Sequence, residues 1–123
     1  MLSKKTGFTL IELVMVIVIL GILFAIAIPR YVDLTTTAKV ATLKANLGTI
    51  RAAVAISYAA SAVEGAAEFP ATISGDLFSD NQIPEESITP IRQVVTSYDG
   101  TGGWWYNAVT GVVHANLEDY REL

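Results

Sequence analysis

The fold is decided near the start of the chain by the stretch Lys4-Lys5-Thr6-Gly7-Phe8-Thr9-Leu10-Ile11-Glu12, which leads into an apolar run from Leu13 to Ile28. The 21 residues from Phe8 to Ile28 would form a helix about 31 Å long, which is enough to cross the hydrocarbon core of a bilayer. Glu12 is the one carboxylate in this span. An unpaired carboxylate inside a membrane costs about 2–3 kcal/mol or more, so we expect Glu12 to meet a cationic partner.

The residues on either side of the apolar run indicate how it is oriented and whether it is removed. A secretory signal would be followed by a small-residue cleavage site, but here Ile28 is followed by Pro29-Arg30-Tyr31. Lys4 and Lys5 favour a cytoplasmic N-terminus by the positive-inside tendency. The sequence therefore predicts a single-span chain whose residues beyond Arg30 lie across the membrane.

The string Gly7-Phe8-Thr9-Leu10-Ile11-Glu12-Leu13 closely resembles the processing site of the type IV pilins and the type II secretion pseudopilins. The resemblance implies that a prepilin peptidase cuts after Gly7 and methylates the new N-terminal residue, Phe8. It also implies that Glu12 meets the N-terminal amine of a neighbouring subunit during filament assembly. The physics is consistent with this, because a buried carboxylate with an ammonium partner is far less costly than one alone.

Composition limits what the remainder can be. With 123 residues, the chain has room for one membrane helix and one small domain. The net charge is −4 and no basic cluster follows the leader, which argues against nucleic-acid binding. There is no cysteine, so packing onto a helix must supply the stability of the domain. Many adhesive type IV pilins close a C-terminal loop with a disulfide, and this chain departs from that pattern.

The first helix is expected to continue beyond the apolar run. Pro29 removes one backbone donor and kinks or locally opens a helix, and Gly21 weakens the same stretch. In related filaments the segment between such a glycine and proline melts and extends the subunit. The alternative is that these residues reflect only the higher frequency of glycine and proline in membrane helices.

The following segment has an apolar helical face. Its members recur at spacings of three and four residues: Val40, Leu43, Leu47, Ile50 and Val54. An alanine-rich stretch follows, and Glu64-Gly65 is a plausible stop. We expect one long helix over residues 8–63, with a membrane-spanning or filament-core part at 8–29 after a cleaved leader at 1–7, and a head domain at 30–123.

The head domain is expected to contain an amphipathic helix at about 30–63, an irregular loop at 64–90 and a β-meander at 91–116. The loop should be tethered by four apolar residues: Phe69, Ile73, Leu77 and Phe78. The strand-like segments are 91–98, 104–106 and 112–116, separated by turns. This predicts an α+β fold in which the long helix packs against a small antiparallel sheet of about three strands, as in type IV pilins. The order W-x-Y-N-x-x-T-G-x-V also resembles the C-terminal hairpin of pilin and pseudopilin heads.

Little in the sequence points to catalysis or to a cofactor. His114 is the one histidine, and its place in an alternating strand predicts a half-exposed structural residue. Zinc is nearly excluded, since there is no cysteine and one histidine. Some major pseudopilins bind calcium in a loop near Asp99, so Asp99 and Asp119 are a weak calcium candidate by oxygen chemistry alone. Of Trp104 and Trp105, alternation places one ring inward and the other outward.

The expected function is that of a structural subunit of a type IV pilus-like filament, not an enzyme. Its implied partners are identical or related pilin subunits, the prepilin peptidase and a pilus or secretion assembly platform. It should be held in the inner membrane before assembly and lie in a periplasmic or cell-surface filament afterwards. One alternative is a pseudopilin that moves folded proteins across the outer membrane. Another is a single-span membrane anchor that never polymerises.

Overall fold

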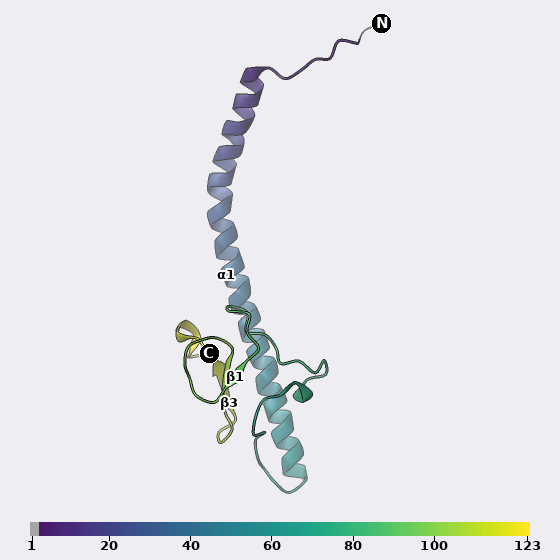
Figure 1. Cartoon of the computed structure of the whole chain (residues 1–123), viewed down its shortest axis with the longest axis vertical. Helices are drawn as coiled ribbons and strands as arrows, with labels where there is room; N and C mark the ends of the chain where they lie inside the picture. Colours follow the sequence, from purple (N-terminus) through teal and green to yellow (C-terminus); the bar gives the residue numbers. More distant parts are fainter. Residues whose placement is uncertain (1–2) are drawn as a thin grey trace. The chain divides into compact units, whose positions relative to one another are not determined.

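The computed structural model describes residues 3–123, which form one long helix, two short 3-10 helices and a small sheet (Figure 1). Helix α1 spans Leu10–Val63, and the 3-10 helices η1 and η2 span Gly75–Leu77 and Glu118–Tyr120. The strands are β1 (Val94–Val95), β2 (Trp104–Asn107) and β3 (Val112–Ala115). The expected α+β class, with one long helix and three strands, is confirmed.

Helix α1 begins two residues after the predicted start at Phe8, and the local hydrogen bonds explain why. The side chain of Thr9 accepts the backbone N–H of Glu12 at 3.3 Å, which makes Thr9 the N-cap of the helix. At the other end Gly65 adopts a φ of +94°, and its N–H donates to Ala62. A glycine in the left-handed region is a common way to end a helix.

The chain divides into two compact units, one ending at Thr37 and the other covering Ala38–Leu123. The second unit, referred to below as the head, contains the later part of α1 and all three strands. In the head, the predicted apolar face of α1 is confirmed for four of its five residues, which are almost completely buried: Leu43, Leu47, Ile50 and Val54. The fifth, Val40, is half-buried. The four buried residues form one core with residues from the loop and the sheet: Ile73, Trp104, Tyr106, Val113 and Ala115.

Polar side chains fasten the loop and sheet to α1 within the head. Asn46 donates from Nδ2 to the carbonyl of Glu85 at 2.8 Å, and Ser87 donates from Oγ to the carbonyl of Lys39 at 2.8 Å. Arg51 donates from Nε and Nη2 to the carbonyl of Val113 at 3.2 and 2.9 Å. These bonds satisfy backbone groups that would otherwise be orphaned when the loop and strands fold onto the helix.

The loop at 64–90 is anchored as the sequence predicts. Ile73 belongs to the buried core, and Phe69, Leu77 and Phe78 pack against it. The aromatic residues of the sheet also hold the loop, because Trp104 Nε1 donates to Pro84 at 2.7 Å and the Tyr106 hydroxyl donates to Pro70 at 2.6 Å. The loop therefore covers the core without regular secondary structure beyond η1.

The sheet is mixed and not wholly antiparallel, so the predicted meander is wrong for its first strand. Strand β2 pairs antiparallel with β3, but β1 pairs with β2 in parallel, with Val94 opposite Trp104. The expected eight-residue strand at 91–98 is reduced to the two residues of β1. Ile91 instead makes a bridge to Glu86, which lies in the preceding loop.

The side chain of Asn116 explains why no hairpin forms between β1 and β2. Its Oδ1 accepts the backbone N–H groups of Asp99 and Gly100 at 3.1 Å, and its Nδ2 donates to the carbonyl of Gly102 at 2.9 Å. Gly102 and Gly103 have φ values of +108° and +76°, which a residue with a side chain rarely adopts. The chain therefore wraps around a buried amide in a wide loop and enters β2 from the same end as β1.

Candidate functional site

The first candidate site is the apolar surface of α1 in the first unit. Within residues 3–123, α1 is the one helix long and apolar enough to cross a membrane. Its large apolar side chains up to Leu34 are exposed, with exposed fractions from 40% at Val14 to 88% at Phe8, which precedes the helix. An apolar surface this large needs cover from lipid or from other protein chains.

Glu12 lies in the first turn of α1 and forms a reciprocal capping box with Thr9. Oε2 of Glu12 accepts the backbone N–H of Thr9 at 2.8 Å and its hydroxyl at 3.0 Å. In return the N–H of Glu12 donates to Oγ1 of Thr9. This arrangement is the capping box, in which a Thr at the N-cap and a Glu three residues later each satisfy one orphan donor of the helix end.

The capping box fixes where the carboxylate of Glu12 can act. Both bonds from Thr9 use Oε2, which leaves Oε1 with no donor among residues 3–123. The carboxylate is also turned back toward the start of the helix, beside Thr9 and one residue from Phe8. Glu12 can therefore keep its cap and offer its second oxygen to an external cation.

Thr9 is a residue that the sequence reasoning missed, although a signal was present. The pattern Thr9-Leu10-Ile11-Glu12 directly before an apolar run is the sequence signature of a capping box. Thr9 is a positioning residue, since it acts through Glu12.

The other predicted residues of the first unit lie before α1 or inside it. Gly7 and Phe8 precede α1 and are exposed, so the proposed cleavage point lies outside helical structure. Gly21 and Pro29 both lie inside α1, whose helix continues through them. Melting of the segment between them stays a prediction.

The weak calcium candidate was Asp99 with Asp119. Asp99 Oδ1 accepts the backbone N–H of Thr101 at 3.1 Å and the Nδ2 of Asn116 at 2.6 Å. The hydrogen bond from Asn116 is the largest cause that holds the pKa of Asp99 below its usual value, and the bonds from Thr101 lower it further. Asp119 lies in η2. No group of three or more His, Cys, Asp or Glu side chains in residues 3–123 is arranged to hold a metal.

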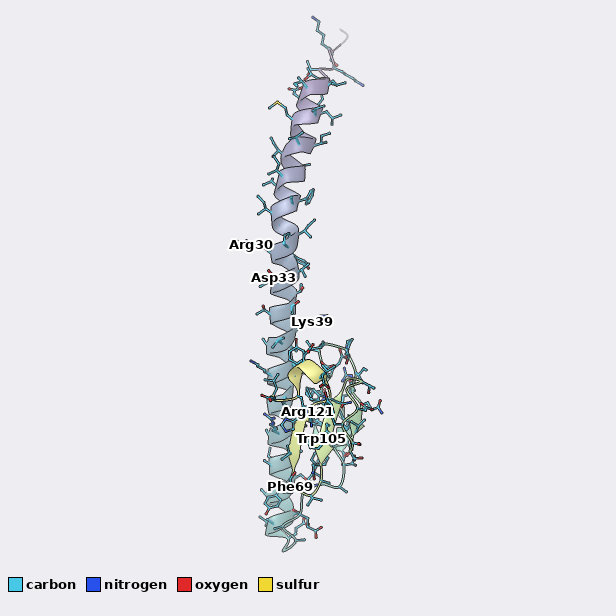
Figure 2. All side chains as sticks on the ribbon, turned by 90° about the vertical axis from the view of Figure 1, so that its left-hand side faces the viewer. Arg30, Asp33, Lys39, Phe69, Trp105 and Arg121 are labelled. Atoms are coloured by element: carbon cyan, nitrogen blue, oxygen red, sulfur yellow. The ribbon has the colours of Figure 1, made fainter. Side chains whose placement is uncertain are left out.

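The outer face of the sheet carries the remaining predicted residues. Trp104 is buried and Trp105 is half-buried, as the strand alternation predicts. His114 is half-buried in β3, directly opposite Trp105, and the two rings stack at 5.6 Å. Figure 2 shows Trp105 and Arg121 close to each other on this part of the head.

An uncovered apolar helix of membrane-spanning length, a capped carboxylate in its first turn and a small α+β head define the class of protein to which this architecture belongs. Residues 2–28 match the model of the Prokaryotic N-terminal methylation motif, so the chain carries this motif. The resemblance of Gly7–Leu13 to the pilin and pseudopilin processing site is thereby confirmed at the level of the motif.

Curated proteins similar to the chain are of both expected kinds. The chain is 59% identical over 54 residues to the type IV narrow pilus major component PilA5 of Thermus thermophilus, covering 44% of this chain and 47% of that protein. It is 44% identical over 54 residues to the type IV major fimbrial protein FimA of Dichelobacter nodosus, covering 44% and 35%. It is 44% identical over 50 residues to the type II secretion system core protein G of Pseudomonas aeruginosa, covering 41% and 35%.

These similarities are limited in extent. Less than half the length of each of these relatives is matched by the chain. No solved structure matches the chain. The comparisons therefore support the identity of the N-terminal segment, and the head must be interpreted from its own residues.

Proposed function

We propose that the chain is a structural subunit of a type IV pilus-like filament, in which its N-terminal helix packs among copies of itself. The observation that carries this proposal is the uncovered apolar surface of α1, whose membrane-length window is not buried at all within the chain. Lipid covers that surface before assembly and neighbouring helices cover it afterwards. Polymerisation then replaces lipid contact with close packing between helices.

Processing and location follow from the motif. The prepilin peptidase cuts between Gly7 and Phe8, removes Lys4 and Lys5 with the leader, and methylates Phe8. The inner membrane holds the chain by α1, with the head on the extracytoplasmic side, because the two leader lysines favour a cytoplasmic N-terminus. In residues 8–28 the one charged side chain is Glu12. Cleavage adds a positive charge to this segment, because it creates a new amine at Phe8.

The capping box suggests how Glu12 contributes to assembly. Oε2 remains bound to Thr9, and Oε1 accepts a hydrogen bond from the methylated amine of a neighbouring subunit. Such a pair removes the cost of an isolated carboxylate in apolar surroundings. It also fixes the axial register between two otherwise uniform apolar helices, since a mismatch would leave both charges unpaired.

Mass spectrometry of the N-terminus tests this function. The chain is recovered separately from filaments sheared off the cell surface and from membranes. We expect a mature chain that begins at methylated Phe8 in the sheared fraction. Retention of Met1–Gly7 in every fraction would contradict both the processing and the assembly.

The similarity to the type II secretion protein of Pseudomonas aeruginosa supports a second candidate, a pseudopilin of a secretion system. The absence of cysteine fits that candidate as well, since no disulfide can close a C-terminal loop. The same experiment separates the two. Mature chain found only in membranes, together with loss of secreted proteins when the gene is deleted, would favour the pseudopilin.

A further inference from the structure

A small pocket lies on the face of the head's sheet that carries Trp105 and His114. It has a volume of about 210 Å³ and is lined by Tyr98, Trp105, His114 and Arg121. These four residues come from the loop after β1, from β2, from β3 and from the turn after η2. The fold therefore brings together four side chains from four separate segments, a convergence that a ligand pocket requires.

Aromatic rings form much of the wall of this pocket. The rings of Trp105 and His114 stack at a centroid distance of 5.6 Å and an interplanar angle of 26°. The Trp105 ring is also fixed in place, because its Nε1 donates to the carbonyl of Thr96 at 3.2 Å. The guanidinium of Arg121 lies 4.8 Å from the centre of the Tyr98 ring, within the range of a cation–π interaction.

Arg121 supplies the charge of the pocket at neutral pH. Burial lowers the pKa of His114, and the nearby guanidinium groups of Arg51 and Arg121 lower it further, so the imidazole is neutral at pH 7. The pKa of Tyr98 is raised, first by burial and then by Glu118, so its hydroxyl stays protonated. The lining side chains therefore carry one positive charge and no negative one.

The guanidinium of Arg121 is also available to a ligand. The one salt bridge among residues 3–123 joins Arg92 to Glu85, elsewhere in the head. Glu118 and Asp99 are both close enough to raise the pKa of Tyr98, but Glu118 accepts the Tyr98 hydroxyl at 3.0 Å, and neither acid forms an ion pair with Arg121 among residues 3–123. The planar donor fork of an arginine matches the two oxygens of a carboxylate.

We infer that this pocket binds a carboxylate carried on a single ring. The carboxylate pairs with Arg121, and the ring lies against the aromatic wall formed by Trp105 and Tyr98. The volume is smaller than that of a pocket for a drug-sized ligand, which limits the ligand to about one ring. Uronic acids and aromatic acids share this chemistry, and the experiment below separates them.

Isothermal titration calorimetry on the full-length chain in a neutral detergent tests the proposal with two matched pairs of probes. Glucuronate is compared with glucuronamide, and benzoate with benzamide, because each amide keeps the ring and shape of its acid but lacks the negative charge and one acceptor oxygen. We expect saturable binding of at least one carboxylate, and binding of its amide weaker by about tenfold or more, since hydrogen bonds to charged groups are the stronger ones. The pair that binds identifies the source of the carboxylate.

Four variants test whether Arg121 is responsible for the binding. Arg121→Gln should weaken it about tenfold or more, whereas Arg92→Gln removes the same charge elsewhere on the head and should change it less than about twofold. Glu118→Gln removes the neighbouring negative charge and should strengthen binding. If Arg121→Gln lowers the unfolding temperature of the head, Arg121→Lys keeps the charge without the fork and should bind a few-fold less tightly than the unmodified chain.

Two results would overturn the inference. The first is that neither carboxylate binds, or that each binds no better than its amide. The second is that Arg121→Gln and Arg92→Gln weaken binding equally, which would indicate a general effect of net charge. Neither result tests filament assembly, which is measured separately by mass spectrometry of the N-terminus in sheared filaments.

Discussion

Leu23 and Leu47 lie on the same helix, 24 residues apart, yet their surroundings are opposite. Leu23 is 57% exposed, and Leu47 is 2% exposed in the core of the head. Each of them has a glycine within two residues, Gly21 and Gly48, so local propensity does not distinguish the two regions. The difference is that one region is covered by its own chain and the other is not.

This comparison shows how a single helix can serve two purposes. The buried stripe from Leu43 to Val54 stabilises a monomer, because it packs against the sheet and the loop. Around Leu23, residues 13–28 are apolar around the whole circumference of the helix, which is typical of a helix covered by lipid or by other helices. The stability of the head should therefore be independent of the first region, and assembly should depend on it.

The largest expected effect comes from making the same substitution in both regions. Leu47→Ala should reduce the free energy of unfolding of the head by about 2–5 kcal/mol, because it leaves a cavity in a packed core. Leu23→Ala should change it by less than about 0.5 kcal/mol, as for surface substitutions. Urea unfolding in detergent, followed by the fluorescence of Trp104 and Trp105, measures both. Equal losses would show that the two regions do not differ as described.

A smaller effect is expected at the start of the apolar region. Thr9→Ala removes the N-cap of α1 and should destabilise the first turn by about 1 kcal/mol. Amide hydrogen exchange at Leu10–Leu13 in micelles should then be faster by several-fold. Thr9→Ser is the matched control, because serine keeps the capping hydroxyl, and it should exchange at the original rate. Unchanged exchange in Thr9→Ala would mean that the capping box does not hold this turn.

The smallest effects concern the pH dependence of the head. The pKa of His114 in the folded state lies below its ordinary value of 6.5, so the unfolded chain takes up this proton first as the pH falls. Stability should therefore decrease as the pH drops below about 6.5, with a slope set by one proton. His114→Gln should flatten the dependence in that window. An identical slope in this variant would contradict the assignment.

Asp99 titrates in a separate window. Its folded pKa lies below its ordinary value of 3.8, so its contribution is present above that pH and is lost as the pH falls through the folded pKa. Asp99→Asn should remove this acid-side decline while leaving the decline below 6.5 in place. Thermal unfolding monitored between pH 2 and 8 separates the two groups.

Much of this structure was predictable from residue patterns. The spacing of Leu43, Leu47, Ile50 and Val54 identifies the buried face of α1, since only a helix brings these residues onto one side. The alternation in β2 correctly predicts that one of the two tryptophan rings faces inward and the other outward, and the structure shows that Trp104 is the buried one. The glycine at position 65 marks the end of the helix because it supplies the left-handed conformation there.

The remaining features depend on tertiary contacts that local patterns do not contain. The parallel pairing of β1 follows from Asn116, whose amide organises a loop up to 17 residues earlier in the chain. The pocket around Arg121 needs four segments to converge, and none of them carries a binding motif by itself. The capping box at Thr9 is different, because it depends only on local sequence. A threonine three residues before a glutamate, directly ahead of an apolar run, is enough to predict it.

The central claim is that Glu12, presented by its capping box, joins one subunit to the next. The most direct measurement counts filaments by electron microscopy in cells that express Glu12→Ala, Glu12→Gln or, as a control, Asp80→Ala, which removes an exposed carboxylate from the head. We predict that Glu12→Ala abolishes filaments and Glu12→Gln nearly does, because glutamine keeps the shape but not the charge, while Asp80→Ala leaves them normal. All three chains should be processed and present in the membrane. Normal filaments in Glu12→Ala would contradict the account.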